Sequence, residues 1–147
     1  MVETGVKMNN PPIVVADADA IVAQASPGDN LHAKAVKTVK KLTQLNAQVL
    51  YPATAITEAT THIQRVLNSR ATAYGTAIAF TNPNVNLVEI NQETINHATQ
   101  FFSPTTSKKN TLYDCIVAAI AEERNADAIF SFDKFYKKKG FKLASDL

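Results

Sequence analysis

The sequence contains little cysteine, little glycine and no long apolar run. A single cysteine among 147 residues excludes an intramolecular disulfide and favours a reducing, cytoplasmic environment. The chain has four glycines and neither a GxGxxG nor a GxxxxGK(S/T) motif, which argues against a glycine loop that cradles phosphate. Histidine and cysteine do not stand at the spacing of zinc ligands. No apolar stretch approaches the roughly 20 residues that span a bilayer, so we expect no membrane partner.

The composition favours one compact domain. Hydrophobic residues make up 46% and charged residues 19% of the chain, which suits a globular protein with a core and not a disordered one. We expect a single domain over residues 11–147, preceded at 1–10 by a flexible polar segment that lacks the apolar region of a signal peptide. The formal net charge of +2 permits a nucleic-acid partner without requiring one.

Short apolar runs alternate with amphipathic segments along the chain. The runs predict strands at 13–16, 48–51, 85–90 and 128–131, with a fifth edge strand at 141–143. Helices are expected at 20–24, 30–45, from Thr54 or Thr57 to about 70, at 71–80, 91–102, 112–123, and after Asp133. Strands that alternate with helices predict an α/β fold of three layers, α/β/α, with a central parallel sheet of four to five strands.

Four acidic residues stand where such a fold would bring them together. Asp17 and Asp133 follow buried strands, and Glu58 and Asp114 lie in the first turns of helices. The carboxyl ends of parallel strands share one edge of the sheet, where α/β proteins bind ligands. Neighbouring carboxylates repel one another, and a hard cation such as Mg²⁺ or Mn²⁺ bound through oxygen relieves that repulsion. The pattern therefore predicts a metal site that activates water and offsets charge on a phosphoryl group.

Each acid also has a structural interpretation that the sequence leaves open. Asp114 fits a capping box, Asp133 fits the N-cap of the helix that follows it, and Glu58 fits a solvated helix surface. Asp19 either accepts a hydrogen bond from metal-bound water or caps the helix that follows it. Asp17 is the hardest to interpret in this way, because a carboxylate directly after a buried strand is costly without a partner.

The acids and the residues around them resemble the motifs of the PIN-domain ribonucleases, and among these the VapC-like toxins of prokaryotic toxin–antitoxin pairs. The similar stretches are VVADADAIV at 14–22, ITEA at 56–59, LYDCIVAA at 112–119 and IFSFDKF at 129–135. In the last of them Ser131 stands in place of the family's threonine. Asp19 stands where the family usually has a small polar residue.

The resemblance implies a sheet in the order 3-2-1-4-5 and Mg²⁺- or Mn²⁺-dependent cleavage of single-stranded or loop RNA. It also implies a homodimer and a protein antitoxin as partners. The residues it assigns to catalysis and metal binding are Asp17, Glu58, Asp114 and Asp133, with Asp19 and Ser131 as supporting residues. We expect the RNA backbone to be attracted by Lys108, Lys109, Lys134, Lys137 and Lys138, although solvated lysines without a partner are the alternative.

Two other functions remain open. The pair Asp17-x-Asp19 also resembles the start of haloacid-dehalogenase-type phosphatases, but Ile21 stands where those enzymes need a small residue such as threonine. They also need a late acidic pair, for which only Asp133 is present. The second alternative is a PIN-like module that binds RNA or protein without activity; the presence of all four acids argues against it.

Overall fold

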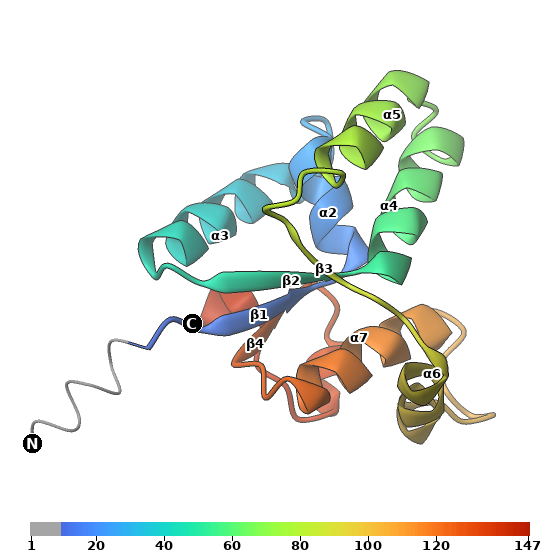
Figure 1. Ribbon diagram of the computed structural model, residues 1–147. Helices are drawn as coiled ribbons and strands as arrows, with labels where there is room; N and C mark the ends of the chain where they lie inside the picture. Colours follow the sequence, from blue (N-terminus) through green and yellow to red (C-terminus); the bar gives the residue numbers. More distant parts are fainter. Residues whose placement is uncertain (1–9) are drawn as a thin grey trace, which may run out of the picture.

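The computed structural model describes residues 10–147 and has a parallel four-stranded sheet at its centre (Figure 1). The strands are β1 (Ile13–Ala16), β2 (Gln48–Pro52), β3 (Asn86–Val88) and β4 (Ala128–Phe130), in the spatial order β3-β2-β1-β4. The first strand of the chain is therefore a central one, paired in parallel with β2 and β4. The flexible segment expected at 1–10 lies, except for Asn10, outside the described residues.

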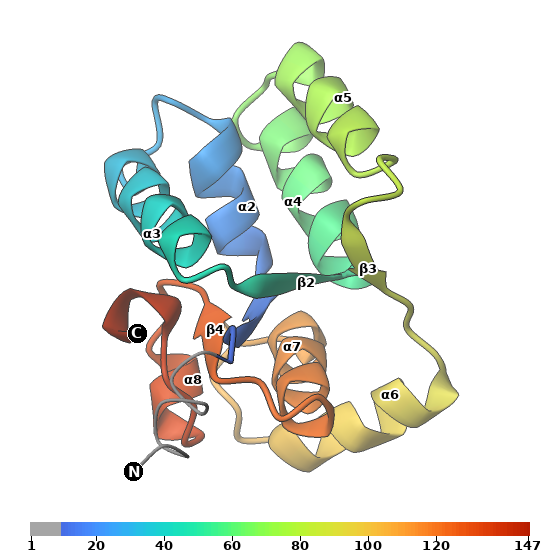
Figure 2. The same cartoon turned by 60° about the vertical axis from the view of Figure 1, so that its left-hand side comes forward.

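Helices cover both faces of the sheet, which confirms the three-layer α/β/α fold (Figures 1 and 2). One face carries α2 (Ala18–Ala25), α3 (His32–Gln44), α4 (Ala53–Arg65) and α5 (Arg70–Ala79). The other face carries α6 (Gln92–Ala98), α7 (Leu112–Glu123) and the short α8 (Phe135–Lys138). Among the described residues, no helix combines the length and the apolar character needed to cross a membrane.

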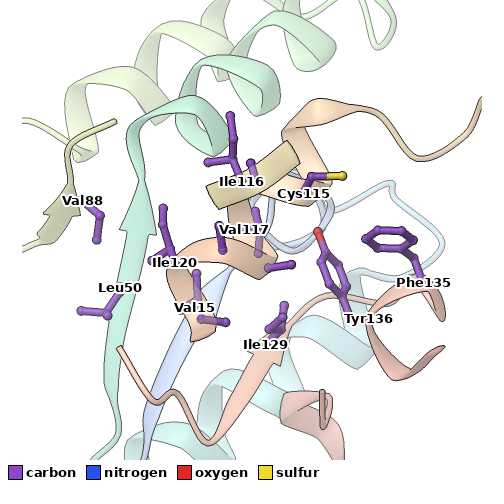
Figure 3. Packing of buried hydrophobic residues seen from close by; sticks show 14 of the residues in the cluster. Val15, Leu50, Val88, Cys115, Ile116, Val117, Ile120, Ile129, Phe135 and Tyr136 are labelled. Carbon is purple, nitrogen blue, oxygen red and sulfur yellow. The ribbon is translucent and has the colours of Figure 1, made fainter. Parts of the chain in front are cut away.

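The apolar run of β1 does not alternate because both of its faces are buried. Val15 packs with α7 on one side of the sheet, and Figure 3 shows it beside Val117 and Ile120. Val14 and Ala16 point the other way and pack with residues of α2 and α3. A strand that is apolar on both faces suits the middle of a parallel sheet, so β1 holds the acid that follows it in the centre of the molecule.

The structure corrects the starts of two helices near the site. The helix after β1 begins at Ala18, because Asp17 and not Asp19 is its N-cap. Neither Thr54 nor Thr57 caps α4, which follows Pro52 without a break and without a side-chain cap. Proline suits this position because it lacks a backbone N–H group, and the first N–H groups of a helix have no partner within the helix.

The expected fifth strand is reduced to one bridge between Ile129 and Leu143. The amide of Ile129 donates to the carbonyl of Lys142 at 2.9 Å. This segment lies beside β4, as the expected strand order requires. The 3₁₀ helix Ala144–Asp146 begins directly after Leu143 and limits the pairing to that bridge.

We expect Leu42→Ala to lower the free energy of unfolding by about 2–5 kcal/mol, because a buried leucine leaves a cavity when it is truncated. Leu42 is 4% exposed in the core under α3, whereas Leu45, three positions later, is 42% exposed. Leu45→Ala is the matched control and should cost less than about 1 kcal/mol. Urea unfolding of both variants measures the difference; equal losses would contradict the packing of α3.

Candidate active site

Asp17 ends the central strand and begins the first helix. Its amide donates to the carbonyl of Phe130 at 3.0 Å, which continues the pairing of β1 with β4. Its Oδ1 accepts from the amide of Ala18 at 2.7 Å, and its Oδ2 accepts from the Tyr136 hydroxyl at 2.6 Å. The side chain is only 3% exposed. The Ser131 hydroxyl lies 3.5 Å from the same Oδ2. The carboxylate is thus fixed at the carboxyl edge of the sheet by one backbone donor and by the hydroxyls of Tyr136 and Ser131.

Asp114 and Asp133 reach the same place from α7 and from the loop after β4. Asp114 accepts at Oδ2 from the amide of Thr111 at 3.1 Å, so the helix-capping interpretation of this residue is also correct. The side-chain amide of Asn110 donates to Asp133 at 2.8 Å and lies 3.4 Å from Asp114. The Tyr136 hydroxyl lies 3.4 Å from Asp114 Oδ1. Tyr136 and Asn110 therefore link three carboxylates into one cluster.

Figure 3 shows how Tyr136 makes this link, with its ring among apolar residues and its hydroxyl oxygen directed toward the end of α7 that carries Cys115. The ring is fully buried and packs with residues of the core under α7. The apolar ring thus carries a hydrogen-bond donor from the core to the acidic cluster.

Asp19 joins the cluster through Ser131. The Ser131 hydroxyl donates to Asp19 Oδ2 at 2.9 Å, and the amide of Phe132 donates to the same oxygen at 2.8 Å. Ser131 in turn accepts from the amide of Asp133 at 3.1 Å, so it connects two acids. The other carboxylate oxygen of Asp19 is buried and has no hydrogen-bond partner among the described residues.

Glu58 approaches from α4. Its Oε1 is the second buried carboxylate oxygen without a partner among the described residues. Glu58 and Asp19 line one cavity of about 230 Å³, together with Ala18, Val22, Asp29, Leu31 and His62. The structure therefore brings Asp17, Glu58, Asp114 and Asp133 to one edge of the sheet, with Asp19 and Ser131 among them.

Burial and mutual repulsion raise the pKa values of Asp17, Asp19, Glu58 and Asp114. Burial, and then the charges of Asp19 and Asp114, raise the pKa of Asp17 well above its ordinary value. Burial raises the pKa of Asp19 to about 6. Burial, with the charges of Asp114 and Asp19, raises the pKa of Glu58 to about 7. Burial also raises the pKa of Asp114. Because ionised carboxylates are unfavourable at this edge of the sheet, a cation that neutralises them would bind favourably there.

The carboxylate oxygens of the cluster are of the type that binds a hard divalent cation, but they do not converge on one point. Within residues 10–147, no three His, Cys, Asp or Glu side chains are arranged to hold a single metal ion. Neutral donors from Tyr136, Asn110 and Ser131 occupy the space between the carboxylates instead. The unpartnered oxygens of Asp19 and Glu58 are carboxylate oxygens, which Mg²⁺ and Mn²⁺ prefer.

The sequence interpretation missed Asn110 and Tyr136. Asn110 directly follows the predicted RNA-binding Lys108 and Lys109, and Tyr136 stands between the predicted RNA-binding Lys134 and Lys137. The available signal for Tyr136 was the apolar pair Phe135–Tyr136 among those lysines, which predicts a buried face. No signal in one sequence distinguishes Asn110 from the other polar residues of its loop.

The predicted RNA-binding lysines lie at the surface near the cluster. Lys108 and Lys109 directly precede Asn110, and Lys134 directly follows Asp133. Lys137 is paired through Nζ with Asp146 Oδ2 at 3.2 Å. The remaining one, Lys138, is exposed on α8.

The fold and the site define an α/β protein with an acidic cluster at the carboxyl edge of a parallel sheet. The profile of the PIN domain matches residues 14–142, nearly the whole chain. The chain belongs to the PIN-domain family. A comparison with curated protein sequences finds no match.

Solved structures support the same fold. VapC20 of Mycobacterium tuberculosis, a toxin that cleaves the sarcin–ricin loop, is 18% identical with a TM-score of 0.73, over 87% of this chain and 95% of that one. VapBC2 of Rickettsia felis, bound to a DNA fragment from its promoter, is 12% identical with a TM-score of 0.59, and the match covers 89% of this chain and 96% of that one. FitAcB of Neisseria gonorrhoeae is 15% identical with a TM-score of 0.59, and the match covers 91% of this chain and 94% of that one.

We expect Glu58→Gln to stabilise the metal-free protein more at about pH 8 than at about pH 5. The pKa of Glu58 is raised from 4.5 to about 7 in the folded state. The folded protein therefore holds this proton more tightly than the unfolded chain, and the stability that it confers is lost as the pH rises through about 7. Glutamine cannot ionise, so the variant escapes this loss.

Urea unfolding in EDTA at the two pH values measures this difference. Glu93→Gln, which changes an exposed glutamate at the start of α6, is the control and should shift stability equally at both. A Glu58→Gln effect that does not depend on pH would contradict the buried setting of this carboxyl group.

Proposed function

We propose that the protein is a Mg²⁺- or Mn²⁺-dependent endoribonuclease that hydrolyses RNA phosphodiester bonds, and that it is the toxin of a type II toxin–antitoxin pair. The observation that carries the proposal is a pair of buried carboxylate oxygens, on Asp19 and Glu58, that have no hydrogen-bond partner within residues 10–147 and whose carboxyl groups have raised pKa values. Membership of the PIN family and the likeness to VapC20, whose described activity is cleavage of an RNA loop, support it.

Asp17, Glu58 and Asp114 are the proposed metal ligands, directly or through water, with Asp133 as a further ligand or a support. When bound, the cation lowers the pKa of water and offsets charge on the phosphoryl group. Asp17 suits this role because Ala18 and Tyr136 fix both of its oxygens. For Oδ2 to bind a cation, the cation would have to replace the hydrogen bonds from the Tyr136 and Ser131 hydroxyls.

The neutral residues around the acids have a separate task. Ser131 and the amide of Phe132 hold Asp19 by one oxygen, which leaves the other free to accept a hydrogen bond from water. Asn110 holds Asp133 in position through its side-chain amide. Fixed orientation of this kind is required because an in-line attack on phosphorus tolerates little misplacement of the water.

The partners proposed with this function are RNA, a protein antitoxin and a second copy of the chain. Large apolar side chains are exposed on α5 and the end of α4: Val66 is 66% exposed, Leu67 40%, Tyr74 71% and Ile78 50%. Exposed apolar residues that gather on neighbouring elements favour a protein interface, and this surface supports the homodimer.

The two alternative functions predict different results. A phosphatase of the haloacid-dehalogenase type would hydrolyse a generic phosphomonoester, and we expect no turnover, since buried Ile21 occupies the place of the required small residue. A binding module without activity would not be stabilised by millimolar Mg²⁺ or Mn²⁺ in a thermal-shift titration. We expect stabilisation, because the cation relieves repulsion among the buried acids.

Asp17→Asn should lower metal-dependent RNA cleavage on the order of 10³-fold or more, because it removes a proposed ligand charge at the centre of the cluster. The fold should be as stable as that of the parent or more so, since one of several repelling charges is gone. Cleavage of a labelled RNA in Mn²⁺ and urea unfolding measure the two effects.

Asp127→Asn is the matched control. Asp127 lies at the opposite edge of the sheet, where its Oδ2 accepts from the amide of Ile13 at 2.8 Å. The asparagine carbonyl can accept the same bond, so cleavage should stay at the parental rate. The proposed function is wrong if the Asp17→Asn protein cuts RNA as fast as this control.

A further inference from the structure

A groove on the outer side of α3 is lined by cations. Its volume is about 590 Å³, and its lining residues are Lys34, Lys37, Thr38, Lys40, Lys41, Gln44 and Ser145. No acidic residue of the described part of the chain is among them. The last turn of the chain closes one side of it, where Lys41 Nζ donates to the carbonyl of Ser145 at 3.2 Å.

The lysines of this groove repel one another without compensation. Lys37 stands three or four residues from Lys34, Lys40 and Lys41, so their side chains are neighbours on the helix surface. Like charges at these spacings destabilise a helix, and α3 contains no acidic residue. Among the described residues, none of the four lysines forms an ion pair. An anion that lies along the groove would remove this repulsion.

One end of the groove lies next to Phe132, whose backbone contacts the acidic cluster. The Lys34 ammonium lies 5.6 Å from the centre of the Phe132 ring, and the amide of Phe132 donates to Asp19. From there Lys37 and Lys41 follow on the same side of α3, over two turns or about 10 Å. In Figure 2, α3 begins after the loop that follows α2 and runs toward β2, and the C-terminal segment lies near the end of α3. The cations thus form a continuous track that starts beside the candidate active site.

We propose that this groove binds the sugar–phosphate backbone of RNA on one side of the bond that is cut. The inference rests on the proposed function and extends it, because it assigns a path to the substrate beyond the acidic cluster. Lysines are mobile point charges without the fixed fork of arginine, so they suit phosphates better than base edges. The groove therefore contributes affinity that is independent of base sequence and sensitive to salt.

The test separates binding from cleavage. The Asp17→Asn protein in EDTA is titrated into a fluorescent single-stranded RNA of about 16 nucleotides, and the dissociation constant is measured by anisotropy at several salt concentrations. On this background, the groove variant combines Lys34→Ser, Lys37→Ser and Lys41→Ser. The control variant combines Arg70→Ser, Arg124→Ser and Lys142→Ser, which removes the same charge from other elements.

In the groove variant the dissociation constant should rise on the order of tenfold. The negative slope of log affinity against log salt should become shallower by about 2, as expected for three lost phosphate contacts. The control variant should change the constant by less than about threefold. Urea unfolding should show that the groove variant is folded, because removing like charges from α3 relieves repulsion.

Other outcomes overturn the inference. Equal losses in both variants mean that only net charge matters and that no track exists. Unchanged RNA binding, with loss of affinity for poly-glutamate in the groove variant alone, assigns the groove to an acidic protein partner. If the parent protein cuts no RNA in Mn²⁺ but binds it through the groove, the proposed function fails; the groove is then an RNA-binding site, and its assignment to one side of a cleaved bond falls with the function. If the three groove substitutions, made in the protein that keeps Asp17, leave both cleavage and binding unchanged, this inference fails and the proposed function stands.

Discussion

The structure depends on a set of buried carboxylates that repel one another at one edge of the sheet. Asp17 is the centre of this set, because β1 is a central strand and delivers the residue into the interior. A carboxylate placed there is tolerated only with donors close by, and the protein supplies the amide of Ala18 and the hydroxyl of Tyr136. The raised pKa of Asp17 shows that these donors offset the burial and the repulsion only in part.

The neutral donors explain how so many acids can lie together without unfolding the protein. Tyr136, Asn110 and Ser131 each contact two acids, so each hydrogen bond also keeps a pair of carboxylates apart. Hydroxyl and amide groups form these bonds without adding charge to the cluster. An arginine in the same place would neutralise the acids permanently and compete with a metal. The choice of uncharged donors therefore keeps the cluster available for a cation.

Charge of the opposite sign is kept outside the cluster and not within it. The lysines near Asn110 and Asp133 and those along α3 are at the surface, whereas Asp17 and Asp114 are buried. A net charge of only +2 conceals this separation, since acids and lysines nearly cancel in the total. A buried acidic site beside basic surfaces is the arrangement that the proposed function requires, since it combines a cationic cofactor with a polyanionic substrate.

The sequence by itself determined the order of strands and helices, the three-layer fold and which acids follow buried strands, because burial on both faces of a strand and on one stripe of a helix is written into local apolar patterns. It could not decide the ends of elements: Asp17 rather than Asp19 caps α2, and residues 141–143 form one bridge and not a strand. Only the tertiary structure brought Tyr136 to Asp17 and Asn110 to Asp133, across 119 and 23 residues of chain. Contacts of that kind arise from how layers pack around a shared edge, and no local pattern of residues encodes them.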